Sequence, residues 1–114
     1  MTTDERQFLL TAVWMFMRHG QRDRARAICE ALVEAEPRDG VAVVAWADLL
    51  LDGGDAARAL DALRGADVPP DLAHVEAVLE TRALRLLGRA DEARARWTRY
   101  LASRKGAARQ WLAN

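Results

Sequence analysis

Gly88-Arg-Ala-Asp-Glu-Ala93, the stretch from which the fold can be predicted, occurs twice more in related form. Thirty-four residues earlier stands Gly54-Asp-Ala-Ala-Arg-Ala59, and thirty-four before that stands Gly20-Gln-Arg-Asp-Arg-Ala25. In each copy an alanine follows the glycine by five residues, and apolar runs flank the pair. Three such copies in phase predict three repeats of one structural unit.

A period of 34 residues with these two small residues is typical of the tetratricopeptide repeat, which is a pair of antiparallel helices. The glycine would end the first helix in a left-handed conformation that other residues disfavour. The alanine would let the second helix approach the first closely. Pro37 and Pro69-Pro70 stand where second helices should stop. We therefore predict an all-α fold of three tetratricopeptide-like helical hairpins in a short right-handed superhelix.

The chain of 114 residues is expected to form a single domain with a modest core. The predicted repeats are about 4–37, 39–70 and 71–104, followed by a short C-terminal capping helix over 105–114. Thr2, Asp39 and Asp71 are the expected N-caps, and Lys105-Gly106 is expected to interrupt the last long helix. The first predicted helix begins at residue 2 or 3 and ends at residue 19. The other predicted helices cover 22–35, 40–53, 55–64, 72–87 and 90–103.

The composition of the chain limits which partners and which cellular compartment we expect. Acidic and basic residues balance at 17 each, which argues against a nucleic-acid partner or an anionic membrane surface. One cysteine allows no internal disulfide, the polar, acidic N-terminus does not resemble a secretory signal, and no apolar run is long enough to span a bilayer. We expect a cytoplasmic protein without direct membrane insertion.

The sequence shows no recognisable catalytic or metal-binding pattern. His19 and His74 have no partner at ligand spacing, and Cys29 occupies the inward slot that Leu63 and Trp97 fill in the other repeats. No phosphate-binding loop or nucleophile motif is present. We therefore expect no enzyme, no metal and no cofactor, and we keep an enzyme only as a weaker alternative.

The first helix of each hairpin should line an inner surface of the array, and the repeat register assigns residues to it. The predicted partner-binding residues are Leu10, Trp14, Met17, Val44, Asp48, Leu51, Val78, Arg82 and Arg85. An apolar groove predicts a partner with an apolar helix or extended strip. Asp48, Arg82 and Arg85 would set its register through polar contacts. Trp14 fits both a core position and a binding hot spot.

The two ends of the chain together resemble one known family. The matching residues are Glu5-Arg6-Gln7-Phe8-Leu9-Leu10, Trp14, Gly20, Arg24-Ala25, Leu32-Val33 and Pro37, then Gly88, Asp91-Glu92-Ala93-Arg94 and Tyr100-Leu101. They resemble the SctY (YscY) chaperones of type III secretion, over about residues 4–104. The middle, about 40–70, matches by repeat register more than by residue.

The resemblance implies a small cytoplasmic chaperone that is not itself exported. Such chaperones bind SctX, an early exported protein, and the pair associates with the export gate component SctV at the inner membrane. The family's N-terminal motif falls on Phe8, Leu9, Leu10 and Trp14. Chaperones of the needle subunit, the usually longer translocator chaperones and a general protein–protein adaptor remain alternatives. Without a client, the exposed groove would favour a homodimer.

Overall fold

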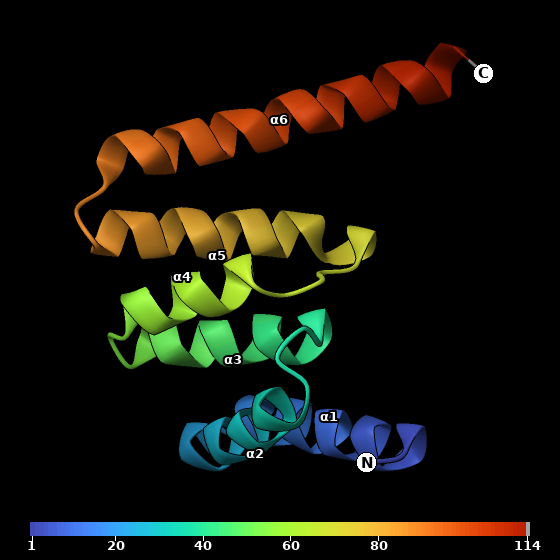
Figure 1. The fold of residues 1–114 in the computed structure, drawn as a ribbon, viewed down its shortest axis with the longest axis vertical. Coiled ribbons are helices and arrows are strands. Elements are labelled where there is room, and N and C mark those ends of the chain that lie inside the picture. Colours follow the sequence, from blue (N-terminus) through green and yellow to red (C-terminus); the bar gives the residue numbers. More distant parts are fainter. Residues whose placement is uncertain (114) are drawn as a thin grey trace.

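Three helical hairpins make up the computed structural model, which describes residues 1–113. The elements are α1 (Thr3–Arg18), α2 (Arg22–Ala35), α3 (Gly40–Asp52), α4 (Ala56–Arg64), the 3-10 helix η1 (Pro70–Leu72), α5 (Ala73–Leu86) and α6 (Ala90–Ala113). The hairpins stack along the longest axis of the molecule, with α1 and α2 at one end and α6 at the other (Figure 1). The predicted all-α hairpin fold is confirmed.

Each of the three in-phase glycines ends a first helix in the same way. Gly20, Gly54 and Gly88 have φ angles of 72°, 82° and 75°. The following amide donates to a carbonyl five residues back, at 2.8 Å in all three copies: Gln21 to Phe16, Asp55 to Leu50, and Arg89 to Leu84. This pattern is the Schellman motif, which needs a left-handed residue at the glycine. The paired alanines, Ala25, Ala59 and Ala93, are buried as predicted.

Gly54→Val is expected to lower the free energy of unfolding by about 2 kcal/mol, because a β-branched residue at φ 82° is strained. Urea denaturation would measure the loss. Gly65→Ala is the control, since Gly65 ends α4 at φ −91° and alanine adopts that conformation freely. Equal midpoints for Gly54→Val and the unchanged protein would contradict the role given to the glycine period.

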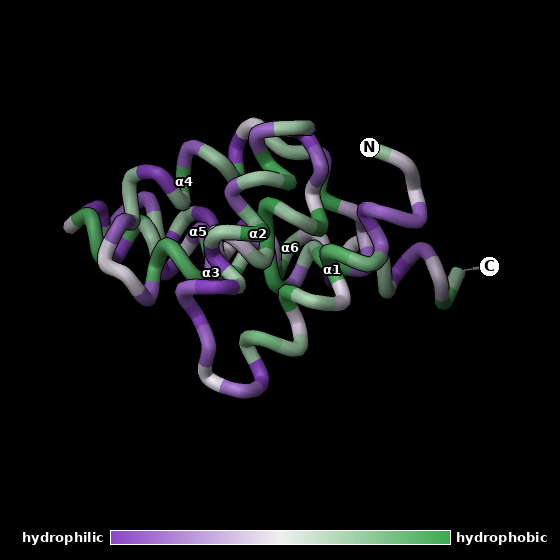
Figure 2. The backbone as a smooth tube through the Cα atoms, turned by 90° about the horizontal axis from the view of Figure 1, so that it is seen from below, coloured by the Kyte–Doolittle hydropathy of each residue, from purple (hydrophilic) through white to green (hydrophobic). Residues whose placement is uncertain are grey.

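Helix α3 is the centre of the core. It packs against α2, α4 and α5, and nine of its thirteen residues are buried. One apolar cluster joins α3 to α1 and α2, and a second joins α3 to α4, α5 and α6. Trp46 lies half-buried between the two clusters and contacts both. Hydrophobic and hydrophilic residues alternate along the other helices, which each bury one face (Figure 2).

The start of the third hairpin differs from the prediction. Asp71 does not cap α5; it lies in η1, and α5 begins at Ala73 after Leu72, whose side chain makes no capping hydrogen bond. The preceding segment instead lies against the start of α3, where the Asp67 amide donates to the Arg38 carbonyl at 2.9 Å.

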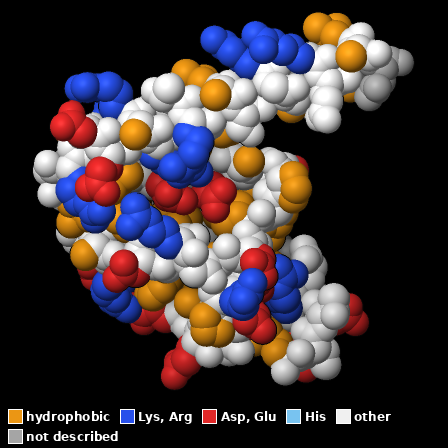
Figure 3. Space-filling model, turned by 45° about the horizontal axis from the view of Figure 1, so that its top comes forward, with side chains coloured by type: hydrophobic (Ala, Val, Ile, Leu, Met, Phe, Trp, Pro, Cys, Tyr) orange, Lys and Arg blue, Asp and Glu red, His pale blue; other side chains and the backbone are white. Residues whose placement is uncertain are grey.

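The predicted C-terminal capping helix is absent from residues 1–113. Lys105-Gly106 does not interrupt α6, which continues through Ala113, and the side chains from Leu101 onward are exposed. One glycine costs a helix only about 1 kcal/mol, and the neighbouring alanine, arginine, lysine and glutamine favour helix. Because α5 begins at Ala73, the last turns of α6 extend beyond it as a projecting arm with a hollow beneath (Figure 3).

Candidate partner-binding surface

The structure divides the predicted partner-binding residues into three groups. Trp14 on α1 is 54% exposed, and Val78, Arg82 and Arg85 on α5 are also exposed. Met17 and Asp48 are half-buried. The remaining three, Leu10, Val44 and Leu51, are buried core residues. The assignment of these three to an open groove is therefore wrong.

These three side chains are buried in the apolar clusters that α3 shares with its neighbouring helices. Leu10 belongs to the cluster that includes Ala45 and Leu49 of α3. Val44 and Leu51 lie in the other cluster, together with Leu79 of α5. The middle hairpin thus has apolar neighbours on both sides, and its inner residues already have partners within the chain.

A four-residue charge network crosses the array at the far end of α3. Arg82 of α5 lies 3.0 Å from Asp52 and 3.6 Å from Asp48, while Arg22 of α2 pairs with the same two carboxylates. Asp48 and Arg82 were predicted to pair with a client, and in this structure they pair with each other. The network links all three hairpins. Because its side chains are partly exposed, it contributes only modestly to the free energy of unfolding.

The accessible part of the inner surface lies on α5 and α1. On α5, one helical stripe carries Val75, Val78, Arg82, Arg85 and Leu86, all exposed. We call these five residues the α5 stripe. Trp14 supplies an exposed aromatic side chain on α1. Apolar side chains beside arginines suit an apolar peptide segment that also carries acidic groups.

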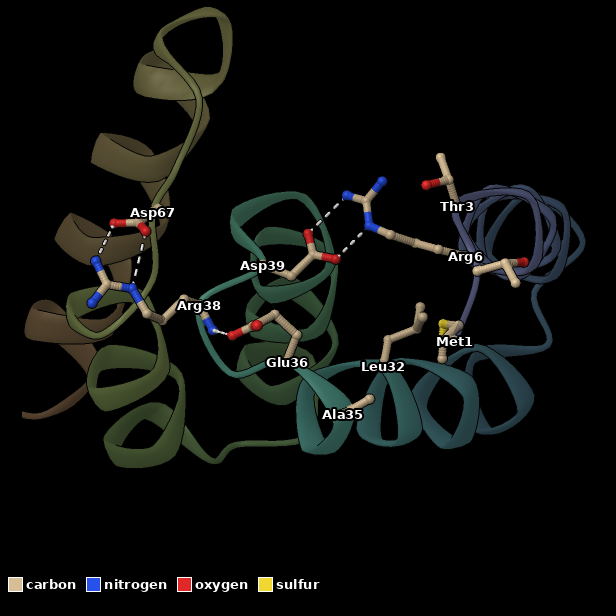
Figure 4. A pocket seen from close by; sticks show the side chains of 10 residues that line it. Met1, Thr3, Arg6, Leu32, Ala35, Glu36, Arg38, Asp39 and Asp67 are labelled. Carbon is tan, nitrogen blue, oxygen red and sulfur yellow. Dashed lines mark hydrogen bonds and ion pairs between the residues drawn. The ribbon is translucent and has the colours of Figure 1, made fainter.

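A cavity of about 620 Å3 marks a structural junction. It opens between the N-terminus, the end of α2 and the start of α3 (Figure 4). Arg6 donates to Asp39 at 2.6 and 2.9 Å, and Arg38 donates to Asp67 at 3.0 and 2.8 Å. Both arginines are paired with carboxylates of the same chain. The charged side chains of this cavity therefore link segments of the protein to one another.

Asp39 makes the stability of this junction depend on pH. Its hydrogen bonds with Arg6 hold the pKa of its carboxyl below the ordinary value, and it also accepts from the Ala42 amide to cap α3. A lowered folded pKa stabilises the protein above the unfolded pKa of about 4, and that stabilisation is lost as pH falls through the folded pKa.

Asp39→Asn keeps a capping oxygen but removes the charge. We expect it to lower the free energy of unfolding by about 1 kcal/mol at neutral pH, because charge-assisted hydrogen bonds are lost. The difference should shrink as pH is lowered from neutral through the folded pKa of Asp39, since the carboxyl of the unchanged protein then becomes protonated too. Urea denaturation across this pH range would measure it. A constant difference at every pH would contradict the assigned pairing.

A second charged junction joins α5 to α6. Arg96 lies 3.0 Å from Glu80 and 3.8 Å from Glu76, and all three side chains are largely buried. Burial and the neighbouring Glu80 raise the pKa of Glu76, while Arg96 opposes that rise. The adjoining cavity of about 390 Å3 is lined by both acids and bases from α4, α5 and α6. Arg96 therefore compensates the charges of the two glutamates within the third hairpin.

Neither Cys29 nor the histidines form a reactive cluster in the part of the chain that the structure describes. Cys29 is fully buried, as predicted, and burial raises the pKa of its thiol to about 12, so the thiol stays protonated at neutral pH. His74 stacks beside Trp97 and Tyr100 at 6.1 and 5.7 Å between ring centroids. Within residues 1–113, no three His, Cys, Asp or Glu side chains are grouped to hold a metal ion.

The sequence analysis missed the segregation of charge along the chain. All 17 acidic residues precede residue 93, whereas the basic residues divide 11 before it and 6 after, so residues 1–92 carry −6 and residues 93–114 carry +6. The overall balance concealed this one-sided basic segment, which a separate count for each half would have detected. On the structure it occupies α6 and its arm.

Comparison with known proteins finds no protein-family model and no curated protein that matches this chain. Among the described helices, none is both long and apolar enough to cross a membrane.

Proposed function

We propose that this protein is a small helical-repeat chaperone that covers an apolar segment of a client protein. The observation that supports this best is the α5 stripe, together with Trp14 on α1. A packed array that buries Leu10, Val44 and Leu51 still leaves Val75, Val78 and Leu86 exposed on an inner helix. Such apolar groups beside arginines fit a partner better than a solvated surface.

The resemblance to SctY chaperones supports a particular client. We propose SctX, an early exported component of type III secretion, with delivery to the export gate SctV from the cytoplasmic side. A chaperone for the needle subunit is the alternative client relationship, and a general adaptor between folded proteins is the alternative function. An adaptor would bind its partners without changing their solubility.

The free energies of burial and association favour client binding through a few anchor residues over binding through a large uniform surface. Covering about 400 Å2 of apolar client surface yields roughly 10 kcal/mol of transfer free energy. Association and the ordering of the client segment cost a comparable amount, so only well-packed anchors leave a net affinity. Trp14 is the largest exposed side chain on the inner helices and is the expected anchor.

Co-expression with a tagged SctX from the same genome tests the proposal. We expect a stable soluble complex, with SctX insoluble by itself. Trp14→Ala should weaken the complex about 30-fold, corresponding to about 2 kcal/mol. The melting temperature of the Trp14→Ala protein alone should barely change, because the Trp14 side chain is 54% exposed. Trp111→Ala is the matched control, since Trp111 is 78% exposed on the arm of α6 and belongs to neither α1 nor the α5 stripe.

Two results would overturn parts of this proposal. Equal losses of stability and of client affinity in Trp14→Ala would place Trp14 in the core. No binding to SctX, with both proteins shown to be folded or soluble, would remove the SctY assignment and make the needle subunit the next client to examine. The helical-repeat fold would be unaffected by either result.

A further inference from the structure

We propose that two copies of this chain form a symmetric dimer in which the two α1 helices pack antiparallel through the outer face of the first hairpin. This contact uses neither the α5 stripe nor Trp14, so it goes beyond the proposed function and does not depend on it. It also differs from the homodimer expected from the sequence, in which the inner groove would be covered. The exposure, the shape and the charge pattern of α1 support it.

The outer face of α1 is a largely exposed apolar surface. Phe8 is 72% exposed and Met15 is 56% exposed. Together with Thr11, Ala12 and Phe16, these side chains line a depression of about 270 Å3. We call these five residues the α1 outer face. Large apolar side chains around a depression on an exposed helix are typical of a surface that packs against another helix.

The repeat register indicates the same role for this face. The equivalents of Phe8 and Met15 one period later are Ala42 and Leu49 of α3. Both are buried in the cluster that α3 shares with the first hairpin. In the second hairpin these positions therefore pack against a neighbouring hairpin. The first hairpin lies at one end of the array (Figure 1), so the same positions of α1 have no hairpin stacked on them within residues 1–113.

The order of large and small side chains along this face is the same in both directions. Phe8 and Met15 are seven residues apart, and Thr11 and Ala12 lie midway between them. A two-fold axis through this midpoint places Phe8 of each copy against Met15 of the other, which is a favourable contact between an aromatic ring and sulfur. Since Thr11 and Ala12 are small, the two backbones can approach closely at the axis. One patch serves both copies, so the contact is isologous and closes at a dimer.

The charges of α1 select the antiparallel orientation. Asp4 and Glu5 stand in the first turn and Arg18 stands in the last turn, and all three side chains are exposed. Arg6, the other charged residue of α1, is paired with Asp39 of its own chain. In an antiparallel pair, the acidic turn of each copy lies beside Arg18 of the other, so both ends of the contact are complementary. A parallel pair would bring like charges together at both ends.

A second copy is therefore the occupant that this face fits. Its α1 helix supplies the apolar side chains, the small centre and the opposite charges in the required order, and α1 is neutral overall. A helix of 16 residues is only about 24 Å long. One pair of such helices buries less than the roughly 1,200 Å2 of a stable interface. We therefore expect a weak dimer with a dissociation constant of about 10 μM, which weakens further at high salt.

Analytical ultracentrifugation of the full chain without a client tests the inference through two complementary variants. The basic variant carries Asp4→Lys and Glu5→Lys, and the acidic variant carries Arg18→Glu. Each variant brings like charges together at both ends of the contact, so each by itself should dimerise about tenfold more weakly than the unchanged protein. An equimolar mixture restores opposite charges at both ends and should form a 1:1 dimer about as tight as the unchanged one. All three side chains are exposed, and circular dichroism melting would verify that both variants fold.

A second pair of variants separates this face from the rest of the surface. Phe8→Glu should abolish the dimer, because it places a charge against Met15 of the other copy at two symmetric contacts. Val78→Glu is the matched control, since it places the same charge at an exposed position of the α5 stripe. For Val78→Glu and for the unchanged protein, the average mass should rise with concentration and level off at a dimer.

Disulfide formation tests the position of the axis. In Thr11→Cys the two new thiols lie beside each other at the axis. In Met15→Cys they lie about 10 Å apart along it, because a helix rises about 1.5 Å per residue. Mild oxidation should therefore produce a covalent dimer of Thr11→Cys but not of Met15→Cys. Cys29 is fully buried and should not compete.

Several outcomes would overturn the inference. A monomer of the unchanged protein at about 1 mM would exclude the dimer, and growth beyond a dimer would exclude the closed symmetric contact. A mixture of the two charge variants that is no tighter than either variant alone would exclude the antiparallel pairing. Loss of association in Val78→Glu, or an unchanged dimer in Phe8→Glu, would place the contact elsewhere on the chain. Equal oxidation of Thr11→Cys and Met15→Cys would indicate parallel helices.

Discussion

Gly40→Ala is expected to destabilise the fold by about 3 kcal/mol, because the new methyl group has no space. A Cβ at Gly40 would lie 2.1 Å from the Asp67 carbonyl oxygen and 2.5 Å from the Val68 Cα. Both are backbone atoms, so a rotamer change cannot relieve the overlap. The segment between α4 and η1 would have to leave the start of α3 and give up the Asp67–Arg38 backbone hydrogen bond.

Urea denaturation and hydrogen exchange of the Asp67 amide would measure both consequences. Gly106→Ala is the matched control, since it makes the same change within α6, where a Cβ would meet nothing within 4 Å among the described residues. It should raise helix content and leave the urea midpoint unchanged or higher, because alanine favours helix over glycine. A Gly40→Ala protein as stable as the unchanged one would show that residues 65–68 do not dock on α3.

Leu51→Ala is expected to lower the free energy of unfolding by about 3 kcal/mol, since it opens a cavity in the core. Leu51 is 3% exposed and packs in the cluster that joins the second and third hairpins. A loss of this size is a large fraction of the roughly 5–15 kcal/mol that stabilises a small domain. The variant should therefore melt at a clearly lower temperature, with a broader transition.

Val78→Ala separates the core from the accessible surface. The sequence assigned Val78 and Leu51 to one partner-binding set, but Val78 is exposed on α5. Its replacement should change the free energy of unfolding by less than about 0.5 kcal/mol. Thermal and urea denaturation of both variants would measure the contrast. Similar losses in the two proteins would contradict the division of the predicted groove into core and surface.

Local signals were sufficient for most of the fold. The conformation of Gly20, Gly54 and Gly88 follows from neighbouring backbone atoms, so a glycine spacing in the sequence predicted three helix ends correctly. The caps Thr2 and Asp39 were also predicted, because each acts on an amide three residues away. The boundaries of α2 were predicted to the residue.

Two failures were local, and a third occurred where distant segments meet. Asp71 has the residue type of a cap, but it lies in η1, and α5 begins at Ala73. Lys105 and Gly106 resembled an interruption, yet a single glycine did not offset the helix preference of its neighbours in α6. For the candidate site, the repeat register could not tell which residues neighbouring helices cover, because that depends on how distant segments pack.

The sequence by itself determined the hairpin repeat, its period, its glycine helix ends and its buried alanines, because each depends on interactions within a few residues. It also contained the separation of −6 from +6 charge at residue 93. The tertiary structure alone decided that Leu10, Val44 and Leu51 are core, that Asp48 and Arg82 pair with each other, and that α6 projects as an arm. The reason is physical: burial and ion pairing depend on which helices pack together, and that packing joins residues about 30 or more positions apart.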